Sequence, residues 1–486
     1  MNTSRSSHIN PEFSSLFVEE SDNPYRACIQ GLANEPICVL ALLRKADAFL
    51  TAAGEQIDLG EYSKETIVER LAANRPRICI IHGSSDHPAH LYDQEHVWRA
   101  AARIWQNGGV PFAFGLPVIC DGTAQSNIGQ SYSLASRNHT AMAVNINFEG
   151  HSYHAAYVLS GCDKTPTGIL SGLAAADRAR RAPERGRAPV WAVFVPSHVL
   201  KGGTIPAPTR HKLRDIQDRA RQAGEVQLAD DIEENCRYIL QCSSDEAFLG
   251  VLSRAVEQGF IVPAESETIL NELAAATCDD KGGICAFNGS GNSSRTLVSA
   301  LGFVPPQAEL LIDEPETALV ARNVDCLFRL INKPEYAVCE ILARNYANAI
   351  RVHNATGSSS NLMLHMPAVM RHAGFDVSLF DYETICNEHP VPDIFAHSLT
   401  ENRDTYVLAE QWLTGQHYGM SSIYKVLDNL RVPMDLDAPT VAGQTWRERL
   451  RNIGQPVSPQ LPQERSEIRI HPVRDISGTD ILRGNF

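Results

Sequence analysis

The sequence has 486 residues and lacks any run of about 20 apolar residues, the length that a membrane-spanning helix requires. Its first residues, MNTSRSSHINPEFSSLF, lack the continuous apolar core of a secretory signal. Positive charge is also scarce, because 43 Lys and Arg stand against 57 Asp and Glu, for a net charge of −14. Nucleic-acid-binding proteins are usually basic. These absences predict a cytoplasmic protein that binds neither membranes nor nucleic acids.

The twelve cysteines include no C-x-x-C pair and show no regular spacing. The missing pair gives no support to a zinc site, and disulfides are rare in the cytosol. The default interpretation of any one cysteine is therefore a small, buried apolar side chain. Nucleotide binding is not indicated either, since GSGNSS (289–294) lacks both the Walker lysine and the Rossmann spacing.

Hydrophobic residues make up 43% of the chain and charged residues 21%, which is typical of a globular enzyme. Short apolar segments alternate with helical patterns of 10–15 residues. The segments expected to be strands are 77–83, 110–120, 155–162 and 189–197. This alternation predicts an α/β fold in which parallel sheets are flanked by helices on both faces, a three-layer αβα arrangement.

The chain divides by composition into two regions. Residues 1–75 read as an N-terminal arm with helices, and residues 76–486 as one α/β domain. Within this domain, about 210–280 is wholly helical and rich in charge, which predicts a helical insertion. Residues 316–375 are also expected to be helical.

Two cysteines have unusual neighbours. Cys120 and Cys162 each end an apolar segment, each is followed by an aspartate, and each precedes a helical pattern. In open α/β sheets, ligands bind at the carboxyl ends of the strands. Cys285 precedes a glycine-rich turn and a helix expected to begin near Ser293, where backbone N–H groups favour an anion.

Thiolates are soft ligands suited to iron–sulfur clusters or zinc, whereas carboxylates suit magnesium. The cysteines and the aspartates that follow two of them would supply both kinds of ligand. They are far apart along the chain, so spacing alone leaves two interpretations open. One is a shared metal site, and the other is buried thiols with helix-capping aspartates.

The motifs around these residues resemble those of the dihydroxy-acid dehydratase and 6-phosphogluconate dehydratase family (IlvD/Edd), which includes sugar-acid dehydratases. The resemblance spans roughly residues 75–486, with the motifs in the family's order. The matching blocks are GGVPFAFGLPVICDGTAQSNIGQSYSLASRN, GCDKTPTG, GGICAFNGSGNS, HNATGSSSNLMLHMPAVMRHAGFDVSLFDY, APTVAGQTWRERL and DILRGNF.

The resemblance implies the roles of the site residues. The cluster ligands would be Cys120, Cys162 and Cys285, and the magnesium ligands Asp121, Asp163 and a carbamylated Lys164. Some family members have a further cluster cysteine in a P-C-N-x-H block, but SSDHPAHLYD here has only His87 and His90, which favours a [4Fe-4S] over a [2Fe-2S] cluster. The substrate would meet Arg137, Asn292, Ser360 and Asn361, although an ion pair for Arg137 and helix capping by Ser360 and Asn361 are alternatives.

The implied reaction is loss of water from a 2,3-dihydroxy acid or sugar acid to give a 2-oxo acid. The cluster would act as the Lewis acid that assists loss of the hydroxyl group, and magnesium would bind the carboxylate. QSNIGQ (125–130) replaces the common M-G-H-x-G-M beside Asp121, so the substrate is expected to differ from the common ones.

The family's catalytic base lies in a C-terminal swivel domain resembling a β-barrel, and this sequence stops at Phe486, directly after LRGNF. We therefore expect the base outside this chain, in a separate small subunit. The alternatives are a shortened homologue and a truncated sequence. The family usually forms dimers, so a homo- or hetero-oligomer is expected. The rival function is a non-catalytic paralogue that serves as a structural or regulatory subunit.

Overall fold

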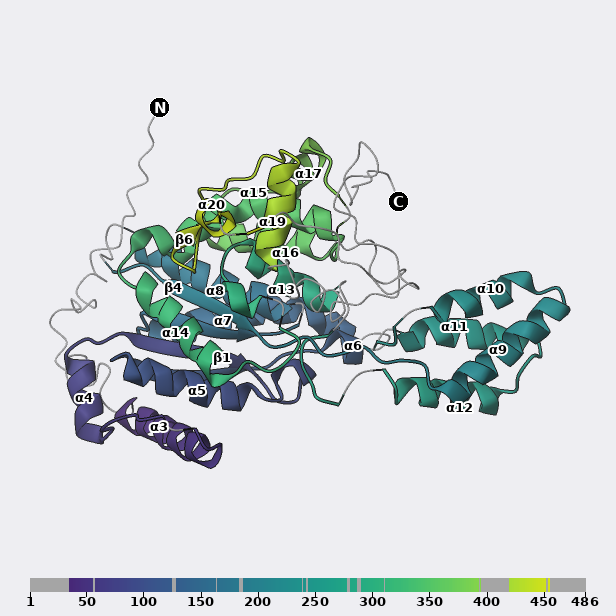
Figure 1. Cartoon of the computed structure of the whole chain (residues 1–486), viewed down its shortest axis with the longest axis horizontal. Helices are drawn as coiled ribbons and strands as arrows, with labels where there is room; N and C mark the ends of the chain where they lie inside the picture. The colour runs from purple at the N-terminus through teal and green to yellow at the C-terminus, as the bar shows by residue number, and fades with distance from the viewer. Residues whose placement is uncertain are drawn as a thin grey trace, which may run out of the picture.

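The computed structural model describes a four-stranded sheet in which every strand is parallel to its neighbours (Figure 1). The described residues are 35–55, 57–124, 128–162, 164–182, 187–237, 239–241, 244–277, 280–285, 290–309, 311–392, 394, 419–451 and 453–454. The strands are β1 (Arg77–Gly83), β2 (Val110–Leu116), β3 (Ala155–Ser160) and β4 (Trp191–Pro196). Both β3 and β4 are buried at every position, as expected for parallel strands covered on two faces.

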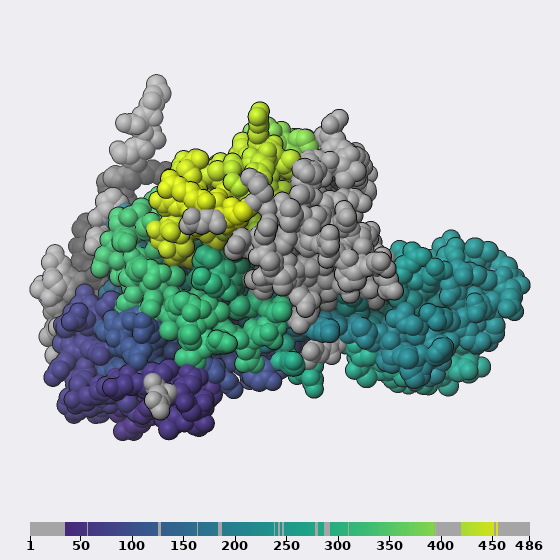
Figure 2. All heavy atoms as spheres, in the orientation of Figure 1, coloured from purple at the N-terminus to yellow at the C-terminus, as the bar shows by residue number. Residues whose placement is uncertain are grey.

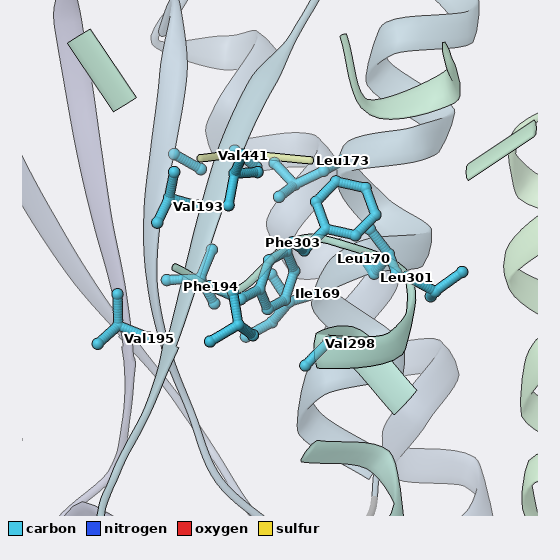
Figure 3. Packing of buried hydrophobic residues seen from close by; sticks show 14 of the residues in the cluster. Ile169, Leu170, Leu173, Val193, Phe194, Val195, Val298, Leu301, Phe303 and Val441 are labelled. Carbon is cyan, nitrogen blue, oxygen red and sulfur yellow. The ribbon is translucent and has the colours of Figure 1, made fainter. Parts of the chain in front are cut away.

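Helices cover the two faces of the sheet and make three layers, which confirms the predicted α/β fold (Figure 1). On one face lie α5 (Asp93–Gln106) and α14 (Thr317–Leu330), with α3 (Glu35–Ala52) and α4 (Lys64–Ala72) outside them. The opposite face carries α7 (Gln130–Gly150), α8 (Lys164–Arg180), α13 (Ser290–Ala300), α15 (Val338–Thr356) and α16 (Leu362–His372). Figure 3 shows the apolar core between β4 and this second layer, where Phe194 faces residues of α8 and Phe303.

The strand order β2-β1-β3-β4 contains a reversal of direction. The connection from β1 through α5 leads to β2 at one edge, and the connection from β3 through α8 leads to β4 at the other. The two crossover connections therefore run in opposite directions from the neighbouring strands β1 and β3. The carboxyl ends of such a pair form the crevice in which open α/β sheets bind their ligands.

Four helices form a separate lobe that projects from the body (Figures 1 and 2). They are α9 (Ala207–Gln222), α10 (Val226–Asn235), α11 (Ser244–Glu257) and α12 (Pro263–Ala274). The lobe has an apolar core of its own, built around Leu213, Ile232 and Phe248. None of the described helices combines the length and the apolar character needed to cross a membrane.

The remaining described elements are short helices, strands and turns. They are α6 (Asp121–Ala124), α17 (Leu379–Glu388), α19 (Met420–Asn429), α20 (Trp446–Leu450), the short strands β5 (Pro439–Thr440) and β6 (Gln444–Thr445), and the 3-10 turns η2 (Pro88–His90), η3 (Pro306–Ala308) and η4 (Pro334–Tyr336). The helical stretch expected at 316–375 is interrupted twice, by η4 and by the left-handed Gly357 that ends α15.

Two element boundaries near the site differ from the predicted ones by three or four residues. Strand β2 ends at Leu116, four residues before Cys120, because Pro117 has no N–H to continue the ladder. Helix α13 begins at Ser290, three residues before the expected start. The first shift moves Cys120 from the end of a strand into a loop, and the second moves Asn292 from a loop into the first turn of a helix.

Two buried histidines predict acid sensitivity of the fold. Burial lowers the pKa values of His96 and His353 to about 4. The folded state therefore holds both rings neutral, while the unfolded chain takes up protons below pH 6.5. We expect the free energy of unfolding to be highest above pH 6.5 and to fall towards pH 4, by up to roughly 3 kcal/mol for each ring.

Urea unfolding between pH 7.5 and 4.5 measures this dependence. His96→Gln should flatten the curve, whereas His211→Gln, at an exposed position on α9, should leave its slope unchanged. Equal slopes for the wild type and His96→Gln would contradict the assignment of this sensitivity to His96.

Candidate functional site

The loops that follow β1 and β3 meet at the carboxyl edge of the sheet. The loop after β1 carries His87 and His90, and β3 leads through Gly161 to Cys162. A Cβ atom at position 161 would lie 2.6 Å from the Cβ atom of Ala89 and 3.3 Å from the His90 ring. Only glycine therefore allows the two loops to approach this closely.

Gly161→Ala should accordingly strain the edge of the sheet. Overpacking of this kind costs about 1–3 kcal/mol, which we expect as a lower free energy of unfolding in urea. The double change Gly161→Ala/Ala89→Gly removes the clashing methyl group and should restore most of the loss. Gly150→Ala, where a Cβ atom would meet nothing within 4 Å, is the matched control. A double variant no more stable than Gly161→Ala would contradict this packing.

The thiols of Cys120 and Cys162 both interact with the imidazole of His87, which is almost fully buried. The backbone N–H of Ala89 donates a hydrogen bond to Nδ1 of His87 at 3.0 Å, so the remaining proton lies on Nε2. Nε2 has no hydrogen-bond partner of regular geometry within the described part of the chain. The ring therefore presents an N–H group to two sulfur atoms from different loops.

The electrostatics of this group follow from burial and from the close pairing. Burial disfavours the charged imidazole and the two thiols act to raise the pKa of His87, but Nδ1 accepts from the N–H of Ala89, so the ring acts as a neutral Nε2–H donor. Burial also acts to raise the pKa of the Cys120 thiol, but the hydrogen bond with His87 lowers it below its usual value. An N–H donor beside the Cys120 sulfur favours the thiolate, the form in which cysteine binds metals.

Cys162 has a left-handed backbone conformation, with φ of 64°. This region is uncommon for residues other than glycine and strained for most side chains. The conformation turns the chain abruptly from β3 into α8, which begins two residues later at Lys164. The strain is consistent with a functional constraint on this thiol.

The segment before Cys285 crosses the loop that carries the histidines. The N–H of Gly283 donates to the carbonyl of Pro88 at 2.9 Å, and the N–H of Ile284 donates to the carbonyl of His198 at 2.7 Å. Both Gly282 and Gly283 have positive φ, at 73° and 117°. These contacts bring the backbone near Cys285 to the loop of His87, although Cys285 lies far away in sequence.

A largely buried ion pair connects the same two cysteine segments a second time. Nζ of Lys164 donates to one carboxylate oxygen of Asp121, and the hydroxyl of Ser133 donates to the other. The exposed fractions of the two charged side chains are only 8% and 15%. The segments around Cys120 and Cys162 are therefore linked twice. Their thiols both interact with His87, and Asp121 of one segment pairs with Lys164 of the other.

The predicted substrate residues are placed on three helices. Arg137 on α7 donates from Nη1 to Nδ1 of His365 on α16 at 2.9 Å. Asn361 caps the start of α16 without a side-chain capping bond, next to the exposed Ser360. Asn292 lies in the first turn of α13 and is fully buried. Their roles as substrate ligands stay predictions.

Asp163 and Gln125–Asn127 lie outside the described residues. Among the residues that are described, no group of three or more His, Cys, Asp and Glu side chains is arranged to hold a metal ion. The side chains that do converge are two thiols, one imidazole, one carboxylate and one amine. Their donor chemistry suits a soft metal centre at the sulfurs and a hard cation at the carboxylate.

Three groups are more prominent in the structure than in the sequence. The first is His87. The second is the pair of His90 and Asp93, joined by a 2.6 Å contact between Nδ1 and Oδ2. The third is Arg295, which is fully buried on α13. The histidines had been noted within the P-C-N-x-H block, but no local pattern marks the arginine of the polar segment SGNSSRTLVSA as buried.

The fold and these side chains define a doubly wound α/β protein with a thiol-containing polar site where its two halves diverge. The sequence matches the model described as "Dihydroxy-acid/6-phosphogluconate dehydratase N-terminal" over residues 75–182 and 191–449. The chain therefore belongs to the dihydroxy-acid/6-phosphogluconate dehydratase family, as the motifs indicated.

Curated relatives agree with this membership. The chain is 28% identical over 406 residues to a dihydroxy-acid dehydratase of Anaeromyxobacter dehalogenans, covering 82% of this chain and 61% of the relative. It is 27% identical over 395 residues to the dihydroxy-acid dehydratase of Picrophilus torridus, covering 80% and 59%. The chain thus spans about 60% of the length of the relatives that it matches.

Proposed function

We propose that this chain is the cluster-binding subunit of a hydroxy-acid dehydratase, a hydro-lyase that converts a 2,3-dihydroxy acid or sugar acid into a 2-oxo acid. The observation that carries the proposal is the two contacts that link the segment of Cys120 and Asp121 to the segment of Cys162 and Lys164. Their thiols converge at His87, and their charged groups form a buried ion pair. Family membership and the curated relatives support the reaction class.

Three thiolates, those of Cys120, Cys162 and Cys285, would hold an iron–sulfur cluster, with [4Fe-4S] favoured. Thiolates are the usual protein ligands of such clusters. Three protein ligands leave one iron of a [4Fe-4S] cluster without a cysteine. In the structure, His87 places its N–H beside two of the thiols, and hydrogen bonds of this kind to cluster sulfurs tune the reduction potential.

Asp121, Asp163 and Lys164 would hold magnesium. An unmodified lysine cannot be a ligand, because its ammonium group has no lone pair and repels a cation. Carbamylation would replace this positive charge with a negative one next to Asp121. The hydrogen bond from Ser133 would then keep the Asp121 carboxylate in place.

When bound, the two groups would supply Lewis acidity at the leaving hydroxyl and at the carboxylate of the substrate. The chain's own residues would orient the acid. Arg137, held at α16 by His365, and the amide of Asn292 are the proposed substrate contacts, with Ser360 and Asn361 at the start of α16. We place the base that removes the C2 proton in a partner, a small swivel-domain subunit, within an oligomer of this chain.

Anaerobic purification tests the proposal. The protein co-expressed with its genomic neighbours should be brown and contain iron and sulfide in equal amounts. With the small subunit present, it should form 2-oxo acids from a panel of sugar acids. Colourless protein without iron, under conditions in which a known iron–sulfur protein is loaded, would instead favour the non-catalytic paralogue.

A further inference from the structure

Helix α13 carries buried polar side chains that the described part of the chain leaves unsatisfied. Asn292, Ser293, Arg295 and Ser299 are at most 2% exposed. Seven of their side-chain nitrogen and oxygen atoms have no hydrogen-bond partner among the described residues, including all three nitrogens of the Arg295 guanidinium. Buried polar atoms are nearly always paired, so this helix face points to a missing partner.

The charges around Arg295 do not balance. The acidic group whose charge acts on it is Glu309, which is itself buried. The carboxylate of Glu309 already accepts from Nη2 of Arg449 at 2.8 Å and from the N–H of Met420 at 3.0 Å. Two buried guanidinium groups therefore share one carboxylate. Burial lowers the pKa of Arg295 to about 9, so the side chain is still a cation at neutral pH.

An uncompensated buried charge is strongly destabilising unless a counter-ion reaches it. The missing partner of Arg295 must therefore be an anion that accepts hydrogen bonds. Guanidinium groups bind carboxylates and phosphates through two parallel N–H bonds, and both anions match the donors present here.

The position of Arg295 in the chain relates the missing anion to the candidate site. Helix α13 begins five residues after Cys285, and Asn292, Arg295 and Ser299 follow one another at intervals of three and four residues on a single helix face. Asn292, which the proposed function places against the substrate, therefore lies on the same side of α13 as the guanidinium one turn further on.

We propose that Arg295 binds a second anionic group of the substrate, a carboxylate or a phosphate at the end remote from the carbons that react. This inference rests on the proposed function, since it assumes that the hydroxy acid binds near Cys285. It narrows the substrate class to acids that are anionic at both ends, with Asn292 as a further donor.

The first test compares two buried arginines in protein without ligand. Arg295→Met removes an unpaired charge and should raise the melting temperature by about 2 °C or more. Arg449→Met removes a paired charge and should lower the melting temperature, because Glu309 loses its partner. A melting temperature that falls for both variants would mean that Arg295 is already paired within the chain, and would overturn the proposal.

The second test supplies anions at constant ionic strength. The probes are inorganic phosphate against chloride, and D-glucarate and 6-phosphogluconate against D-gluconate, which is anionic at one end only. Phosphate and at least one of the doubly anionic acids should raise the wild-type melting temperature above the matched control, and Arg295→Met should lose this gain. Glucarate and 6-phosphogluconate distinguish a carboxylate from a phosphate. No gain in the wild type, or an equal gain in Arg295→Met, would overturn the proposal.

The outcome is separable from that of the proposed function. Iron and sulfide contents report the cluster and should be the same in Arg295→Met as in the wild type. Protein that contains the cluster but is not stabilised by anions would contradict only the assignment of Arg295. A protein without iron that still shows Arg295-dependent binding of anions would sink only the dehydratase.

Discussion

Cys162→Gly is expected to abolish iron–sulfur binding while leaving the fold intact. The φ of 64° at Cys162 is unfavourable for a side chain and ordinary for glycine, so this substitution removes the thiol and relieves backbone strain together. We expect the iron and sulfide per chain to fall at least about tenfold, since a thiolate ligand is lost outright. Cys162→Ser should also lose the cluster but keep the strain.

The matched control is Cys339→Ala. Cys339 is a buried thiol on α15 whose sulfur lies 3.6 Å from the carbonyl of Ala174, and burial raises its pKa far above the usual value. Such a thiol is a packing group rather than a ligand, so iron content should be unchanged. Iron retained in Cys162→Gly, or lost equally in Cys339→Ala, would remove Cys162 from the proposed cluster site. Circular dichroism and urea unfolding show whether each variant is folded.

The sheet was accessible from sequence because its signals are local. The segment RICIIHG is apolar and bounded by polar residues, and the observed β1 occupies the predicted 77–83. Where a strand ends is less accessible, since it depends on pairing with its neighbour. Leu116 is the last residue of β2 that pairs with β1, and the apolar residues that follow are irregular.

The site was accessible from sequence only in part. A cysteine followed by an acid at the end of each of two strands indicated the carboxyl edge of the sheet, where the structure places Cys120 and Cys162 beside His87. The family resemblance named Lys164 and Asp121 as ligands of one cation, and in the structure these two side chains form an ion pair. Packing across the chain was not accessible. The approach of Gly161 to Ala89 and the crossing of Gly283 over Pro88 are long-range contacts with no local signature.

The same limit explains why Arg295 was missed. On a helix, an arginine is by default a solvent-facing residue, and its burial here depends on α8, α15 and α19, which pack around α13 from distant parts of the sequence. Its lack of a partner follows from the ion pair between Glu309 and Arg449, which are 140 residues apart in sequence. Departures of this kind from local rules concentrate at functional sites.

Lys164→Met is expected to remove magnesium binding and leave the cluster in place. Lys164 and Asp121 form the buried pair that joins the two cysteine segments, but neither supplies a thiolate. If Lys164 is carbamylated, protein supplied with carbon-13 bicarbonate should show one carbamate resonance that disappears in Lys164→Met. The affinity for magnesium, measured by calorimetry, should fall at least about tenfold, while iron and sulfide stay at wild-type values.

Lys201→Met is the control for this substitution, because Lys201 is an exposed loop lysine that follows β4. Its carbamate signal and magnesium affinity should equal those of the wild type. Asp121→Asn should weaken magnesium binding by a similar factor, since the amide keeps the shape of the carboxylate but not its charge. A carbamate resonance that persists in Lys164→Met, or magnesium affinity unchanged in both site variants, would show that the buried pair is a structural link and that the hard cation binds elsewhere.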